Sequence, residues 1–195
     1  MSGTSTNSCT TLQKSMKWCQ GKPEYPGIKK RVFFISTSVI TKWPQYTVDS
    51  LGRPTSASPT GSFTLAEGEK WKCIDHLPAK ATVRSETQGE APSQTFKNTV
   101  EIVHPGVGPD ATDAASLLLN DQLVFLVEDM RGDFRLIGSE KYQDAVAEVK
   151  QDLGQGATGT TGTTITLTSS DIVSLPVYKG EIVTEDGTIN EDTTP

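Results

Sequence analysis

The most apolar stretch of the chain lies near its middle, between residues 117 and 139. Residues 123–127 are apolar at every position, which is typical of a short strand that is buried on both faces. A polar segment with one glycine then reverses the chain, and residues 133–137 return with polar and apolar positions alternating. Two runs joined by such a turn predict an antiparallel hairpin over residues 123–137, at the centre of the core.

Shorter runs rich in β-branched and aromatic residues predict further strands. Residues 29–36 form one of them, and residues 63–65 and 70–74 are expected to pair as a hairpin around a Glu-Gly-Glu turn. Residues 163–168 alternate between polar and apolar positions, as a strand with one buried face does. The strands that close the fold are expected at residues 175–178 and 181–183.

One helix is predicted before the central hairpin, with Asp110 as its N-terminal cap. Its apolar positions recur at the spacing of a single helical face, and they are Ala111, Ala114, Ala115 and Leu118. The segment 140–153 leaves two interpretations open. A helical period runs from Tyr142 to Val149, but Gly154 follows closely, so a strand over residues 147–153 is the alternative.

Residues 79–103 predict a long hairpin that has little to bury. Its first strand places small or polar side chains on one face and charged or polar side chains on the other. Such a hairpin is a candidate for the wall of a solvated channel or for a subunit contact, and an ordinary exposed edge hairpin is the alternative. The residues assigned to this candidate surface are Arg84, Glu86, Gln88, Glu90, Lys97 and Glu101.

Composition favours a mainly β protein with long polar loops. Hydrophobic residues make up 34% of the 195-residue chain, which also contains 17 glycines and 11 prolines. The formal net charge of −6 argues against general affinity for nucleic-acid backbones, which requires a basic surface. Three cysteines cannot form a closed set of disulfides, so we expect reduced thiols in a cytosolic setting. Neither a membrane span nor a signal peptide is recognisable, and we expect a soluble protein.

No motif predicts an enzyme. Residues 154–159 carry the glycine spacing of a dinucleotide site, but they lead into a β-branched strand, so a flexible loop is expected. Cys73 and His76 offer half of a zinc site without a second half, and neither His76 nor His104 accompanies a nucleophile motif. The Arg-Gly-Asp sequence at residues 131–133 spells an adhesion tripeptide that turn chemistry explains. We therefore expect no catalytic residue, no cofactor and no metal.

The two ends of the chain are polar and carry opposite charge. Residues 1–45 contain seven Lys or Arg and one Glu (7 − 1 = +6), whereas residues 181–195 contain five Asp or Glu and no basic residue, which gives −5. We expect a polar N-terminal arm (1–20), a single β-rich domain (21–184) and an acidic C-terminal tail (185–195). Complementary charges can direct head-to-tail association, and the alternative is that both arms only confer solubility.

Several features together resemble the major tail (tail tube) proteins of bacteriophages and prophages. These are the polar N-terminal arm, the strand RVFFI at residues 31–35, the helix before LVFLVEDMRGDFRLIGS, and the Gly-rich passage into TTITLTSSD, with PVYKGEI after it. The resemblance spans residues 20–185 and lies in the order of elements more than in a diagnostic motif. It implies a mainly β fold, an antiparallel β-sandwich or half-barrel with one flanking α-helix and extended N- and C-terminal arms, and it brings no catalytic residues.

The same resemblance implies a structural function in the virion. In that family, six copies form a ring whose inner sheets join into a continuous channel, and rings stack through arms and loops into a tail tube. DNA passes through the channel during ejection, and the walls are usually acidic or neutral and so avoid binding it. The implied partners are other copies of the chain and other phage tail proteins, without a membrane, and assembly takes place in the bacterial host cytoplasm.

Two other classes of function stay open. One is another phage structural component, such as a capsid-decorating, connector or tail-terminator protein. The other is a monomeric carbohydrate- or protein-binding β-sandwich, in which Trp18, Trp43 and Trp71 would supply stacking surfaces. Light scattering and electron microscopy of the purified protein separate these classes, because they differ in whether rings, tubes, decorated shells or monomers form.

Overall fold

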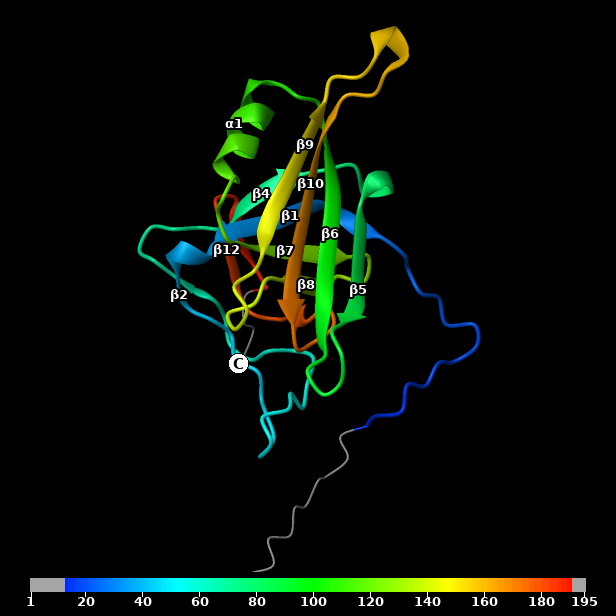
Figure 1. Cartoon of the computed structure of the whole chain (residues 1–195), viewed down its shortest axis with the longest axis vertical. Helices are drawn as coiled ribbons and strands as arrows, with labels where there is room; N and C mark the ends of the chain where they lie inside the picture. The colour runs from blue at the N-terminus through cyan, green and yellow to red at the C-terminus, as the bar shows by residue number, and fades with distance from the viewer. Residues whose placement is uncertain (1–12, 191–195) are drawn as a thin grey trace, which may run out of the picture.

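The computed structural model describes residues 13–190 of the chain. Two antiparallel sheets face each other, and their strands cross steeply in Figure 1. The five-stranded sheet has the order β11 (Val177–Tyr178), β8 (Phe134–Ile137), β7 (Leu123–Asp129), β1 (Ile28–Ser36), β4 (Lys72–Asp75). The four-stranded sheet has the order β5 (Thr82–Gln88), β6 (Thr95–Pro105), β10 (Gly162–Asp171), β9 (Val146–Asp152). The predicted mainly β sandwich with one flanking helix is confirmed.

The predicted central hairpin forms the middle of the five-stranded sheet. β7 lies between β8 and β1, and all five residues from 123 to 127 are buried. Their side chains alternate between two clusters: Phe125 enters one, and Val124 and Leu126 enter the other. A strand with apolar contacts on both faces cannot tolerate polar positions, which explains the continuous apolar run.

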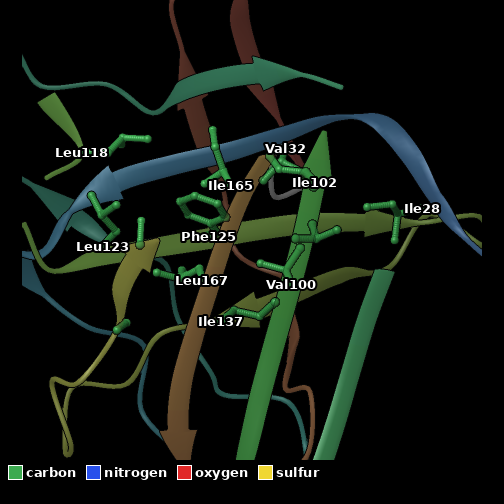
Figure 2. Packing of buried hydrophobic residues seen from close by; sticks show 13 residues of the cluster. Ile28, Val32, Val100, Ile102, Leu118, Leu123, Phe125, Ile137, Ile165 and Leu167 are labelled. Carbon is green, nitrogen blue, oxygen red and sulfur yellow. The ribbon is translucent and has the colours of Figure 1, made fainter. Parts of the chain in front are cut away.

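The first cluster fills the space between the two sheets. Figure 2 shows Phe125 and Val32 of the five-stranded sheet meeting Val100 and Ile102 of β6 and Ile165 and Leu167 of β10. The second cluster lies on the opposite face of the five-stranded sheet, under the loops that connect β2 (Ile40–Lys42), β3 (Thr64–Leu65) and β4 and under the C-terminal segment. The five-stranded sheet is thus covered on both sides, whereas the four-stranded sheet has only one apolar face.

Within residues 13–190 there is one α-helix, α1 (Pro109–Leu117), and it flanks the sandwich beside β9 in Figure 1. The N-terminal cap is Gly108, with Pro109 in the first turn, so the predicted capping role of Asp110 is wrong. Proline is favoured at this position because its missing N–H would have no partner within the helix. Asp110 instead lies in the first turn, where its charge is favourable near the helix N-terminus.

Three further sequence predictions need correction or completion. Residues 63–65 and 70–74 do not form a hairpin, because β3 pairs with β2 while β4 pairs with β1. The open segment 140–153 contains a strand, β9, after a turn. The acidic tail does not begin at residue 185, because β13 (Gly187–Ile189) pairs with β12 (Ile182–Thr184) and belongs to the domain.

The described part of the N-terminal arm lies outside the sandwich and is not packed against either sheet. Every residue from 13 to 27 is exposed, and the segment precedes β1 as an extended chain in Figure 1. Two contacts hold it near the domain: the Lys14 ammonium donates to the Thr55 carbonyl (2.9 Å), and Glu24 pairs with Arg131 (3.2 Å). The remainder of the predicted arm (1–12) and the end of the predicted tail (191–195) lie outside the described residues.

Candidate functional site

The outer face of the four-stranded sheet is the surface that the sequence assigns to a channel wall or a subunit contact. Strand register decides which side chains reach it. Val100, Ile102, Ile165 and Leu167 point into the core, so the alternating residues of β6 and β10 point outward. The outward residues of neighbouring strands lie directly opposite one another: Arg84 pairs with Thr99, Thr99 with Thr168, and Thr168 with Val146.

Hydroxyl groups form the middle of this face. The outward residues of β10 are Thr164, Thr166, Thr168 and Ser170. Thr168 shares a hydrogen bond of 3.3 Å with the hydroxyl of Thr99 on β6, and the Gln88 amide donates to Ser170 (2.7 Å) and Thr95 (3.1 Å). These bonds link three neighbouring strands above the backbone ladder, so the polar face is ordered without apolar contacts.

Charged side chains of both signs flank the hydroxyl groups. The basic ones are Arg84, Lys97 and Lys150, and the acidic ones are Glu86, Glu101 and Glu148. Asp152, at the end of β9, adds one further carboxylate. A shallow depression of about 240 Å³ is lined by residues of all four strands, including Arg84 on one edge and Glu148 on the other. The face is therefore hollowed, hydrophilic and close to electrically neutral.

The structure brings together five of the six residues that the sequence assigns to this surface. Arg84, Glu86 and Gln88 of β5 and Lys97 and Glu101 of β6 all project from the outer face. Glu90 does not, because it lies in the loop between β5 and β6, beyond the last paired residue of β5. The hairpin is thus as predicted, and its turn lies outside the face.

The sequence analysis missed the other half of this surface. β9 and β10 extend the face by two strands, and β9 contributes Glu148 and Lys150. The signal was present in the sequence, because Glu148 and Lys150 alternate with Ala147 and Val149 at the spacing of a strand. A helical period in the same segment obscured it.

The two edges of the four-stranded sheet run in opposite directions. Each strand is antiparallel to its neighbour, so β5 at one edge and β9 at the other have opposite polarity. A second copy in the same orientation would therefore set its β5 antiparallel to the β9 of the first. The start of β9 is bridged at Val146 to Gln122, which leaves the outer edge of residues 148–152 open.

The other candidate chemistries find no geometric support within residues 13–190. Cys73 is exposed, whereas His76 is buried. His76 lies two positions after Ile74 and so on the same face as Ile74, which means that the Cys73 and His76 side chains point to opposite faces of β4. No three His, Cys, Asp or Glu side chains of the described part gather as a metal ion would require. The glycine-rich segment 154–159 connects β9 to β10 through a short 3₁₀ turn, without the helix that a dinucleotide site needs.

The three tryptophans do not form a common stacking surface. Trp71 is only 2% exposed and packs in the second cluster, and the half-buried Trp43 meets Phe63 at a ring distance of 5.3 Å. Trp18 alone is well exposed, on the N-terminal arm. The Arg-Gly-Asp tripeptide forms the β7–β8 turn, in which the Asp129 carboxylate accepts from the Arg131 and Asp133 N–H groups.

A second concavity, of about 430 Å³, lies between the segment 43–59 and the end of β10. Its buried polar groups are Ser139 and Asp171, and the Asp171 carboxylate accepts from the Ile172 N–H (2.6 Å) and lies 3.4 Å from the Tyr46 hydroxyl. Burial raises the pKa of the Asp171 carboxyl to about 6, and burial followed by the nearby Asp171 charge raises the pKa of Tyr46. Through its backbone and tyrosine partners, Asp171 anchors the loop.

Comparison of the chain with family models, with curated proteins and with solved structures finds no match. Within residues 13–190, no helix is both long enough and apolar enough to cross a lipid bilayer. The functional argument therefore depends on the surfaces of the molecule itself.

Proposed function

We propose that the chain is a self-assembling structural protein whose copies join their four-stranded sheets edge to edge into a ring. The ring surrounds a channel lined by the hydroxyl-rich face, and stacked rings form a tube. In this proposal the protein is a phage tail tube protein that acts in the virion tail, with six copies in a ring as in the family that its sequence resembles. Its partners are further copies and other tail proteins.

The observation that carries the proposal is the opposite polarity of β5 and β9 at the two edges of one sheet. Because the strands alternate, lateral repetition of a single contact continues the sheet as an all-antiparallel one. A contact between two different edges is head-to-tail, and such contacts close into rings when the rotation between copies divides a full turn. Closure also removes exposed strand edges, which are otherwise sites of uncontrolled pairing.

The composition of the outer face supports a channel rather than a site that holds a ligand. Three basic side chains are balanced by three acidic ones and the carboxylate of Asp152, between rows of threonine hydroxyls. Protein affinity for nucleic acid depends on basic side chains that displace counterions from phosphates. A near-neutral wall offers little of this, so DNA could pass along the channel without being retained.

The association state of the purified protein tests this proposal. We expect a concentration-dependent shift from monomer to rings by light scattering, and rings or tubes with a central hole in negative-stain images. Capsid-like decoration or a single terminal ring would favour the other phage structural roles. A protein that remains monomeric at high concentration would contradict the proposal and favour a ligand-binding sandwich.

An edge variant makes the test specific to the sheet. Arg84→Glu changes an exposed side chain of β5, so folding should be unaffected while the β5–β9 junction is weakened. Lys42→Glu, on the exposed part of β2 in another layer of the molecule, makes the same change of charge away from both edges. Arg84→Glu should shift the association to higher concentration, and Lys42→Glu should not.

A further inference from the structure

The edge strand β4 borders an apolar groove that the proposed ring contact does not use. The groove has a volume of about 370 Å³ and lies between β4 and the small side chains of α1. Phe34, Ile74 and Ile165 form its apolar floor, and Ala111, Ala114 and Leu118 of α1 line the other side. Polar residues border its rim, namely Lys72, Cys73, Asp75, His104, Asp110 and Thr163. The edge of β4 is covered only at its ends. At one end the Trp71 N–H donates to the Val183 carbonyl, and at the other the His104 Nδ1 lies 2.7 Å from the Asp75 carbonyl oxygen.

The two faces of β4 differ in character. Ile74 is partly buried toward the groove, whereas Cys73 and Asp75 point to the other face, where Arg31 pairs with Asp75 (3.1 Å) and Asp186 (2.9 Å). The charges that act on Cys73 are one guanidinium, from Arg31, and three carboxylates, from Asp75, Asp186 and Glu185. An occupant of this edge would thus meet a groove with an apolar floor and a charged rim of Lys72 and Asp110 on one side, and a surface with more carboxylates than basic groups on the other.

The N-terminal arm has the complementary pattern. Residues 16–19 read Met-Lys-Trp-Cys, so in an extended strand Met16 and Trp18 share one face and Lys17 and Cys19 share the other. Both apolar side chains are exposed in the single chain, Met16 completely and Trp18 to 63%. Tryptophan is enriched among the residues that dominate binding energy at protein interfaces, so an exposed Trp18 beside Met16 suits a binding segment.

We propose that residues 16–19 of one copy bind as an added strand along the free edge of β4 in a second copy. Trp18 and Met16 enter the groove beneath α1, and Lys17 and Cys19 lie over the acidic face beside Cys73. This inference rests on the proposed self-assembly and identifies the surface to which the arm binds. Addition of a strand to a sheet edge supplies backbone hydrogen bonds, and the alternating side chains supply specificity.

A second copy is the occupant because the arm of the same chain is directed elsewhere. The arm leaves the domain at Ile28, the end of β1 away from Phe34 and the groove. Figure 1 shows it on the side of the molecule opposite α1. The contacts of Lys14 with Thr55 and of Glu24 with Arg131 lie along that route.

The natural cysteines test this docking directly. In an antiparallel strand added to β4 with Trp18 opposite Ile74, Cys19 would lie directly opposite Cys73. Opposed residues of an antiparallel pair have Cα atoms about 4.5–5.5 Å apart, within the separation of about 4.4–6.8 Å that a disulfide requires. The Cys9→Ser variant, which retains Cys19 and Cys73, is treated with diamide, which oxidises two thiols to a disulfide and is itself reduced to the hydrazine. We expect a ladder of linked chains on non-reducing gels, because each copy both donates an arm and accepts one.

Isotope labelling identifies which chains are joined. In a mixture of ¹⁵N-labelled and unlabelled protein, the peptide that joins Cys19 to Cys73 should contain one chain of each kind in part of the product. A Cys19–Cys73 peptide found only within single chains would contradict docking on a second copy. Absence of this peptide from oxidised assemblies would contradict the whole inference, because the cysteines would then not be neighbours.

Matched variants separate the groove contact from a chance encounter of thiols. Trp18→Ala should slow the linkage about tenfold or more, as expected for loss of an aromatic anchor, whereas Tyr25→Ala, at the other exposed aromatic of the arm, should not. Lys17→Glu should slow it about two- to fivefold, and Lys14→Glu should have less effect. Equal rates for Trp18→Ala and the parent protein would overturn the placement of the arm.

The same samples distinguish failure of this inference from failure of the ring. Rings that form without the Cys19–Cys73 linkage would leave edge-to-edge assembly intact and remove the arm from the groove. Linked chains in a protein that forms no rings would support the arm docking and contradict the ring.

Discussion

The two sheets of this protein have the same antiparallel construction and opposite surroundings. The five-stranded sheet has an apolar cluster on each face, and its middle strand has no exposed residue from 123 to 127. The four-stranded sheet has one apolar face and one face of hydroxyl and charged groups. Burial on both faces suits a scaffold, whereas a polar face with open edges is free to meet other molecules.

The contrast shows where stability and function are separable in this chain. Outward threonines such as Thr166 bury little apolar surface, so the residue type at these positions depends on the molecules that the outer face contacts. Inward residues such as Phe125 are set by packing. Substitutions in the two sheets should therefore have different consequences, and the predictions below compare them in order of expected size.

The largest effect is expected in the five-stranded sheet. Phe125 is fully buried and packs against Phe34 at a ring distance of 5.9 Å. Phe125→Ala should lower the free energy of unfolding by about 3–5 kcal/mol, the range for removal of a core aromatic. Thr166→Ala, on the outer face of the other sheet, should change it by less than about 0.5 kcal/mol. Similar losses in urea denaturation of the two variants would contradict the contrast between the sheets.

A pH-dependent effect is expected at the end of the four-stranded sheet. The Asp171 carboxyl faces inward near Tyr46 and Asp144, and burial raises its pKa from 3.8 to about 6. Because the folded-state pKa is the higher one, the contribution to stability is complete below pH 3.8 and is lost as the pH rises through about 6. Asp171→Asn keeps the acceptor oxygen without the charge, so it should gain up to about 2–3 kcal/mol relative to wild type between pH 4 and pH 8. A variant-to-wild-type difference that does not change with pH would show that Asp171 ionises freely.

The five-stranded sheet should respond to pH in the opposite sense. His76 follows β4 and is buried; neither ring nitrogen makes a hydrogen bond of regular geometry, and the backbone groups of Leu77 and Lys29 only partly offset the burial of the ring. Burial lowers its pKa, so its contribution to stability is present above pH 6.5 and is lost as the pH falls through the lower folded-state value. His76→Leu should raise the free energy of unfolding by about 1 kcal/mol at neutral pH, because a buried polar ring without a regular hydrogen bond is removed. The variant should also lose less stability on acidification, and denaturation at pH 7 and pH 5 measures both effects.

The strands with strong local signals could be predicted from the sequence. The hairpins β7–β8 and β5–β6 join neighbouring segments through short turns, and their alternation alone defines the faces. Five of the six residues assigned to the candidate surface lie on one face because side-chain parity follows from the sequence once the strand is known. Glu90 fails this rule because the strand ends before it.

The remaining features depend on contacts between distant segments, which the sequence does not encode locally. β3 contains two residues and pairs with β2 rather than with β4. β4 pairs with β1, where Val32 lies opposite Ile74 and Phe33 opposite Cys73. The acidic end of the domain is held by the Arg31–Asp186 ion pair and by β13, neither of which alternation predicts. The groove beside β4 exists only because α1 and β10 meet there.

Accessibility of the four-stranded sheet before and after assembly tests the central claim most directly. Glu86→Cys is placed in a background in which Cys9, Cys19 and Cys73 are Ser, and Lys42→Cys in the same background is the control. Both cysteines should react equally with a bulky maleimide in the dilute monomer, because both positions are exposed. In the assembled protein we predict that Glu86→Cys becomes protected while Lys42→Cys continues to react. Unchanged labelling of Glu86→Cys in assemblies of confirmed size would mean that the polar face looks outward and does not line a channel.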